Sequence, residues 1–101
     1  MDKRVVLSKG SNKGKRFRVT MNFPNKHHHE FGSATGKTFI DGRSEKEKKN
    51  WVARHKKDKG WDNNHQGIWY SRHLLWGPYT SLLKNIKALE KKDGIKIINK
   101  L

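Results

Sequence analysis

Residues 16–23 read Arg16-Phe17-Arg18-Val19-Thr20-Met21-Asn22-Phe23. Apolar and polar residues alternate throughout this stretch, so an extended chain here has one apolar face and one polar face. This period of two is typical of a half-buried β-strand, and the Pro24-Asn25 pair that follows is typical of a turn. The alternation therefore predicts a strand over residues 16–23 that buries one face.

Other strands are expected around this one. Residues 26–31 are predicted to return as a second strand, and residues 37–41 to form a third after the glycine-containing turn at residues 32–36. Residues 5–7 are expected to add a short edge strand, and residues 95–98 a last strand near the C-terminal end.

The second half of the chain has helical patterns. Ser44-Glu45-Lys46-Glu47 is a capping box, in which the serine hydroxyl accepts from a backbone N–H and the glutamate three residues on reaches back. The helix is expected to run from there to about Lys59, where Gly60 stops it. Residues 71–76 are expected to form a short helical turn. Thr80 is predicted to cap a further, amphipathic helix, whose apolar side consists of Leu82, Leu83, Ile86 and Leu89.

This order of elements predicts an α+β fold: a small antiparallel sheet of three to four strands with two to three helices packed on one face. We expect a single domain over residues 1–101, in which residues 8–15 form a flexible basic loop. Residues 95–101 are expected to form the C-terminal strand or a tail.

The composition describes a very basic chain with a small core. Its 101 residues include 24 Lys and Arg against 9 Asp and Glu, a formal net charge of +15, and only 32% of them are apolar. Four Trp, four Phe and two Tyr argue against disorder. The absence of cysteine excludes disulfides, zinc-ribbon sites and thiol catalysis.

A chain with this charge repels itself unless it meets a polyanion, which predicts nucleic acid, an anionic membrane or an acidic protein surface as the partner. No apolar run reaches the ~18–20 residues that a bilayer-spanning helix requires, so no transmembrane segment is expected. Residues 1–7 are not followed by the apolar stretch of a secretory signal. A soluble, intracellular protein is the simplest expectation.

Two motifs that suggest a ligand have a simpler interpretation. Residues 32–38 resemble a phosphate-binding P-loop, but one residue is missing between the glycines, and a strand is expected where the motif requires a helix. A strand brings only His27 and His29 of the 27–29 histidine run to one face. A third metal ligand would have to come from Glu30, His55, His65 or His73. We therefore expect no metal or other cofactor, and a polar strand surface that gains charge below about pH 6.5.

Histidines also suggest catalysis. His55, His65 and His73 are the residue type that supplies the acid–base pair of a small nuclease, but their spacing does not bring them together. Asp58 and Asp62 lack a third nearby acid for two-metal chemistry. We therefore expect no enzyme activity, and a half-buried structural role for His55.

Aromatic residues between residues 51 and 79 are interleaved with basic ones, an arrangement that binds single-stranded nucleic acid by stacking. In a chain poor in aliphatic residues the same rings must also supply core area. We expect core positions for Trp51, Trp69 and Trp76. Trp61 and Tyr79, which lie beside loops, are the candidates for exposed stacking.

The chain contains the motifs Arg54-His55-Lys56, Trp61 and Ser71-Arg72-His73-Leu74-Leu75-Trp76-Gly77-Pro78, an opening basic strand at residues 15–21 and a Phe31-Gly32 turn. In these motifs it resembles a family of small basic, uncharacterised proteins of nucleocytoplasmic large DNA viruses, over about residues 13–90. The sequence departs from the family pattern between Phe31 and Asp41, where the family often has a Gly-Tyr-x-Asp-Tyr-like run. The resemblance implies a viral setting and no enzyme activity.

We therefore expect a non-enzymatic basic structural protein of a virion, a minor capsid protein or assembly component, which adheres to acidic capsid protein or packaged DNA through a cationic surface. The expected location is the virion, or the host cytoplasm or virus factory during assembly, and no small-molecule substrate is expected. A sequence-nonspecific nucleic-acid-binding protein is the alternative, and a small nuclease is the second alternative. The sequence has no motif typical of base readout.

Arg72 is expected to stack on a ring or pair with a carboxylate such as Glu90 or Asp62, or alternatively to contact a ligand. The basic residues expected to contact the polyanion are Lys13, Lys15, Arg16, Arg18, Arg54, Lys56, Lys57 and Arg72. Trp61 and Tyr79 are the aromatic candidates for stacking beside them.

Overall fold

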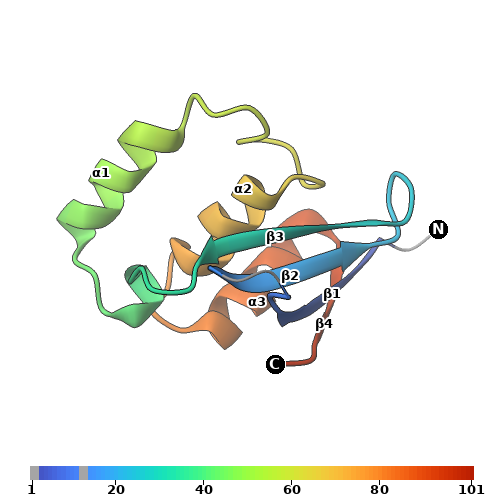
Figure 1. The fold of residues 1–101 in the computed structure, drawn as a ribbon. Helices are drawn as coiled ribbons and strands as arrows, with labels where there is room; N and C mark the ends of the chain where they lie inside the picture. The colour runs from blue at the N-terminus through green and yellow to red at the C-terminus, as the bar shows by residue number, and fades with distance from the viewer. Residues whose placement is uncertain (1–2, 12–13) are drawn as a thin grey trace.

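The strands form one mixed sheet. The computed structural model describes residues 3–11 and 14–101, and within these residues four strands pair in the order β3-β2-β1-β4 (Figure 1). The strands are β1 (Arg4–Lys9), β2 (Lys15–Met21), β3 (His27–Ser33) and β4 (Lys96–Asn99). β2 pairs antiparallel with both β1 and β3, whereas β4 pairs parallel with β1.

The alternating stretch is the strand that its pattern predicts. Phe17, Val19 and Met21 are buried, and the polar residues between them are only half-buried. Residues 5–7 were expected at the edge of an antiparallel sheet, and this was wrong. β1 is an inner strand, because the chain returns after its last helix and places Ile97 beside Val5 in parallel.

The strand predicted over residues 37–41 was also wrong, because Phe39–Asp41 is a turn of 3-10 helix, η1. The Asp41 carboxylate accepts hydrogen bonds from the backbone N–H and the hydroxyl of Thr38, at 2.9 and 2.8 Å. This local closure curls the segment, and Gly42 then ends it at a φ of 103°. The side chain therefore overrides the extended preference of the apolar residues.

The first long helix, α1 (Glu45–His55), begins at the capping box that the sequence predicts. The Ser44 hydroxyl accepts from the N–H of Glu47 at 3.1 Å, and the Glu47 carboxylate accepts from the N–H of Ser44 at 3.3 Å. The helix ends at His55 instead of continuing to Lys59, because a series of tight turns follows, the first closed by the N–H of Asp58 on the carbonyl of His55 at 2.8 Å.

Three helical segments remain: α2 and η2, which are continuous, and α3, which follows them in the chain. α2 (Gly67–Tyr70) passes directly into η2 (Ser71–Leu75), one turn of π-helix that includes most of the predicted helical turn. α3 (Leu82–Asp93) follows with the predicted apolar stripe, but its cap is Ser81, whose hydroxyl accepts from the N–H of Lys84 at 3.3 Å, and not Thr80.

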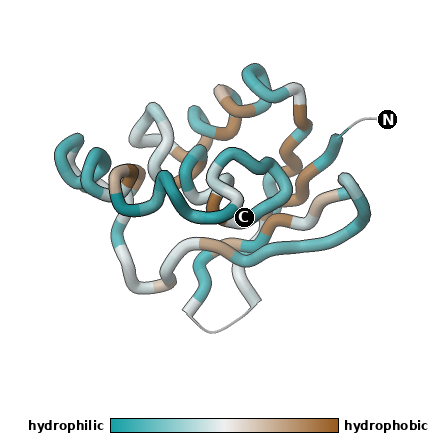
Figure 2. Tube along the Cα trace, turned by 90° about the horizontal axis from the view of Figure 1, so that it is seen from above, coloured by the Kyte–Doolittle hydropathy of each residue, from teal (hydrophilic) through white to brown (hydrophobic). Residues whose placement is uncertain are grey.

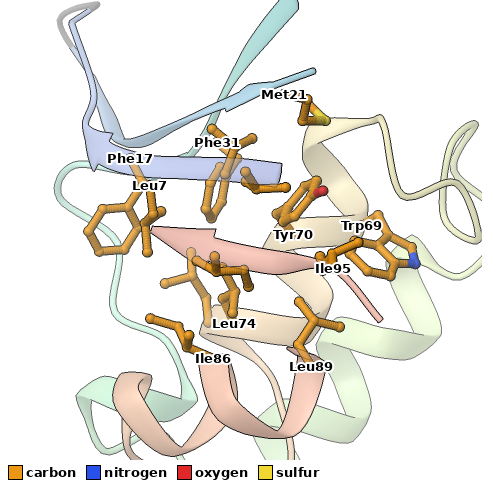
Figure 3. Close-up of a cluster of buried hydrophobic side chains, with 14 of the residues drawn as sticks. Leu7, Phe17, Met21, Phe31, Trp69, Tyr70, Leu74, Ile86, Leu89 and Ile95 are labelled. Carbon is orange, nitrogen blue, oxygen red and sulfur yellow. The ribbon is translucent and has the colours of Figure 1, made fainter. Parts of the chain in front are cut away.

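Helices α2, η2 and α3 cover one face of the sheet, and the core lies between them (Figure 3). Its fully buried members include Leu7 and Val19 from the sheet and Tyr70 and Leu74 from the helices. The sheet with one helical layer is a small α+β domain, as the sequence predicts. We call this sheet with α2, η2 and α3 the body.

Helix α1 lies to one side of the body (Figure 1). Figure 2 shows the apolar segments concentrated in the body, whereas α1, on the left in both views, is mostly hydrophilic. Trp51 is its buried residue. We call α1 and the turns that follow it to residue 62 the arm.

The loop predicted at residues 8–15 was wrong at both ends, since Ser8 and Lys9 belong to β1 and Lys15 begins β2. Residues 12–13 of that prediction lie outside the described residues. The predicted C-terminal strand is present as β4, and its end is fixed by a hydrogen bond from the N–H of Lys100 to the carbonyl of Leu7 at 2.8 Å. Among the described residues, no helix is both long and apolar enough to cross a membrane.

Candidate polyanion-binding site

The arginines of β2 are tied to carboxylates. Arg16 makes two hydrogen bonds to Asp41, at 2.6 and 2.9 Å, and this pairing is the main reason that the pKa of Asp41 falls to about 2. Arg18 donates to the Ser11 hydroxyl at 2.7 Å and lies 3.8 Å from Glu30. Both guanidinium groups therefore join strands and loops within the protein. Lys15 is exposed beside them, and Lys13 lies outside the described residues.

Arg72 combines both of the structural roles that were expected for it. Its guanidinium donates to the Asp62 carboxylate at 2.8 Å and to the carbonyl of Trp61 at 3.1 Å. It also lies 4.4 Å from the centre of the Trp61 ring. Of the two carboxylates considered, Asp62 is the partner, and the arginine holds the end of the arm against the body.

The expectation that Trp61 is exposed was wrong, since only 9% of this residue is accessible. Trp51 stacks on Trp76 at 5.1 Å with 13° between the ring planes, and contacts Trp61 at 5.6 Å. Trp61, a candidate for stacking on bases, therefore packs against Trp51 instead. Trp51 and Trp69 are buried as predicted, whereas Trp76 is half-buried. We call Trp51, Trp61 and Trp76 the tryptophan stack.

The side chain of Lys48 makes a second contact between the arm and the rest of the protein. The Lys48 ammonium donates to the carbonyl of Gly77 at 2.8 Å and lies 4.4 Å from the centre of the Phe39 ring. The tryptophan stack and Lys48 therefore position α1 across from the loop that follows β3.

A groove lies between this loop and α1. Its inner cavity has a volume of about 230 Å³ and its outer cavity about 370 Å³. Lys37, Arg54 and Trp76 line both cavities, so the two are adjacent. The inner cavity is further lined by Gly32, Ser33, Gly36, Thr38, Trp51, Ser71 and Leu75, and the outer cavity by Arg43, Glu47 and Asn50. We call this feature the basic groove.

The charges of the basic groove are only partly compensated. Arg43 pairs with Glu47 at 2.8 Å. By contrast, no carboxylate within residues 3–11 and 14–101 forms an ion pair with Lys37 or Arg54. Both residues are exposed at the groove, so they leave it with a surplus of positive charge that can meet an anion.

Lys56 and Lys57 line a different and more open hollow of about 680 Å³ beside the turns that follow α1. Asp58, Asp62 and Asp93 line the same hollow. These carboxylates offset the lysines, and this makes the hollow a poor site for a polyanion.

A third basic region is the exposed side of α3. Tyr79, which is 48% exposed as expected, lies with Lys84, Lys87 and Lys91 around a shallow depression of about 360 Å³. Lysines at this spacing share one face of the helix. We call these four residues the α3 lysine face.

Three of the histidines, His27, His29 and His65, lie near one another, whereas His55 and His73 lie elsewhere. His27 lies 5.2 Å from His29 and 6.1 Å from His65, ring centre to ring centre. His55 contacts Asp58 at 2.7 Å, and the ring of His73 packs on Trp69. Within the described part of the chain, no group of three His, Asp or Glu residues is placed to hold a metal ion.

Burial is the main cause of the pKa shifts among these histidines. It lowers the pKa of His29, with the charges of His27 and His28 acting in the same direction. It also lowers the pKa of His73, to about 4, with Arg72 and Lys92 adding to the effect. Both residues therefore favour the neutral form.

Only part of the basic groove was predicted from the sequence. Arg54 was a candidate, whereas Lys37, Arg43 and the exposed side of Trp76 were not. Lys37 follows the glycine-containing turn that resembles a P-loop, so the signal was present in the sequence but had been assigned to a turn alone.

Comparison with known proteins places the chain in a family. A model of a family of unknown function, DUF5754, matches residues 5–55, just over half of the chain. This segment runs from β1 to the end of α1 and therefore includes Lys37, Arg43 and Arg54 of the basic groove. No curated protein and no solved structure matches the chain. The chain belongs to the DUF5754 family.

Proposed function

We propose that the protein is a non-enzymatic basic structural component of a virion, a minor capsid or assembly protein that adheres to acidic capsid protein or packaged DNA. The supporting observation is the basic groove, where Lys37 and Arg54 face an opening without a paired carboxylate in the described residues. The viral setting rests on the resemblance of the Ser71–Pro78 segment and the Arg54-His55-Lys56 motif. The protein would act in the virion, or in the host cytoplasm or virus factory during assembly.

The distribution of charge supports adhesion more than chemistry. Arg16, Arg18 and Arg72 are used to hold the fold together. Other cations lie on separate surfaces, among them the groove, the arm and the α3 lysine face. Such a surface binds extended or repeated negative charge better than it binds one small molecule.

Binding to defined polyanions tests this proposal. Purified full-length protein is titrated into fluorescently labelled polyglutamate and into labelled duplex DNA at low salt, and anisotropy is measured. We expect binding to at least one of them, weakening as salt rises because exposed charges are screened over ~10 Å at 0.1 M. If neither polymer binds at low ionic strength, or if the protein cleaves the DNA, the proposal is wrong.

The α3 lysine face favours a second candidate function, sequence-nonspecific binding of nucleic acid. An exposed tyrosine beside lysines on one helix face offers contacts to phosphates without base readout. If about six phosphates are neutralised, log Kd plotted against log salt for duplex DNA has a slope of magnitude near 5, from ~0.9 per phosphate. A DNA affinity that does not change with salt would contradict this candidate.

A further inference from the structure

The inner cavity of the basic groove differs in chemistry from its rim. Trp51, Trp76 and Leu75 give it apolar walls, and Gly32 and Gly36 also line it. Its volume of about 230 Å³ accommodates one aliphatic or aromatic side chain. A site with apolar walls and a few charged groups at its mouth is typical of ligand recognition.

The rim carries two net positive charges. Glu47 neutralises Arg43 at 2.8 Å, and Lys37 and Arg54 remain. A duplex presents a long row of evenly spaced phosphates, for which a row of cations is the usual partner. Two cations close to a carboxylate suit a short acidic segment better.

The loop of the groove does not offer a phosphate cradle either. Such cradles use several free backbone N–H groups. Here the Ser33 hydroxyl accepts from the N–H groups of Thr35 and Gly36, at 3.3 and 3.0 Å, and the N–H of Thr38 donates to Asp41. The N–H groups of Thr35, Gly36 and Thr38 are therefore used within the protein, and the side chains of Lys37 and Arg54 are left to meet the ligand.

We propose that the basic groove binds a short acidic peptide segment of a partner protein, with one apolar side chain in the inner cavity and flanking carboxylates on Lys37 and Arg54. This inference rests on the proposed function and names the partner class for one of its surfaces. A guanidinium such as that of Arg54 matches a carboxylate with two parallel hydrogen bonds. The half-buried ring of Trp76 supplies the apolar contact between the two cations.

The experiment compares two variants that lose the same charge. Lys37→Ala/Arg54→Ala removes the cations of the groove, and Lys87→Ala/Lys91→Ala removes two exposed lysines of α3. The probe is a fluorescein-labelled peptide with one leucine flanked by glutamates, and its affinity is measured by anisotropy. We expect the groove variant to bind the peptide about tenfold more weakly, and the α3 variant about twofold more weakly or less, since it changes only long-range attraction.

The peptide supplies a second, independent control. Replacing its leucine with serine keeps the charge and removes the side chain that would fill the cavity. We expect this change to weaken binding to the wild-type protein several-fold and to have less effect on the groove variant, which no longer holds the flanking carboxylates. Circular dichroism of both variants checks that the substitutions, which alter exposed side chains, leave the helix content unchanged.

Three outcomes would overturn the inference. Equal losses in the groove and α3 variants would mean that only net charge matters, and no effect of the peptide leucine would mean that the cavity is not used. A loss of affinity for labelled oligothymidylate in the groove variant that exceeds the loss for the peptide would assign the groove to single-stranded nucleic acid. In each case binding to polyglutamate or duplex DNA can persist, so failure of this inference is distinguishable from failure of the proposed function.

Discussion

The body and the arm are held together by different kinds of contact. The body has a continuous core in which Val5, Leu7, Val19, Leu74 and Leu75 are fully buried. The arm buries Trp51, and it meets the body through the tryptophan stack, Lys48 and Arg72. Burial of apolar area stabilises the body over many contacts, at about 25 cal/mol per Å², whereas the arm depends on a few.

This difference explains where the charge of the protein can be placed. A helix that packs a broad apolar stripe against the core has fewer positions left for charged residues. Because α1 is attached mainly through one tryptophan, its other positions are free to carry Lys46, Lys49 and Arg54. The same attachment forms one wall of the basic groove, so the weaker region of the fold carries a proposed binding surface.

The largest effect is expected from a cavity in the body. Leu74→Ala removes a side chain with no exposed surface and should lower the free energy of unfolding by about 2–5 kcal/mol, the range for such core truncations. Urea denaturation followed by circular dichroism measures the change. Leu83→Ala is the matched control, since Leu83 is 62% exposed on α3 and its truncation should cost ~0.5 kcal/mol or less. Similar losses in the two variants would show that the core assignment is wrong.

A smaller and more local effect is expected from the arm. Trp51→Ala removes the ring contacts to Trp76 and Trp61, and aromatic pairs contribute ~0.5–1.5 kcal/mol each beyond their area. We expect a loss of about 1–3 kcal/mol, together with fast amide hydrogen exchange over residues 48–55, while the amides of β2 stay protected.

Hydrogen exchange with mass spectrometry makes this measurement, and Val52→Ala serves as the control on the same helix, since Val52 is only half-buried. If β2 and α1 lose protection to the same extent in Trp51→Ala, the arm and the body are one cooperative unit, and the distinction between them fails. The variant should also bind the acidic peptide weakly, because Trp51 lines the inner cavity.

Local patterns predicted the parts of the fold that local interactions form. The alternation in β2, the capping box of α1 and the apolar stripe of α3 each involve residues a few positions apart. The parallel pairing of β4 with β1 joins the two ends of the chain, and no local pattern contains this information. The prediction of a strand over residues 37–41 was wrong for a related reason. Asp41 is held by Arg16 of β2, which is distant in sequence, as well as by Thr38.

The candidate site was predicted less well, since its residues come from separate segments. Arg54 was identified from the basic run in which it lies, but its neighbours Lys37 and Trp76 lie about 20 positions away on either side. The sequence could not show that Arg16, Arg18 and Arg72 pair with carboxylates, or that Trp61 is covered by Trp51 and Arg72. Charge alone predicts a polyanion partner, and the pairing of each cation decides which surface is free to bind it.

The smallest effect is expected from pH, and it acts on the body. His73 packs on Trp69 at 4.4 Å, and burial, with Arg72 and Lys92, lowers its pKa to about 4, while Asp93 and Asp62 act in the opposite direction. In the unfolded chain a histidine has a pKa near 6.5. Below about pH 6.5 the unfolded state therefore binds a proton that the folded state does not, and the protein loses stability until the pH reaches about 4.

We expect a loss of ~1–2 kcal/mol between pH 7 and pH 4.5, less than the full pKa difference implies, because the ring is half-buried and partly screened by solvent. His29, whose pKa is also lowered, contributes in the same direction. Urea denaturation at the two pH values makes the measurement, and His73→Gln removes the titrating group while keeping a polar side chain. The variant should lose distinctly less stability on acidification than the wild type. An equal loss in both would mean that acid weakens the protein at a group other than His73.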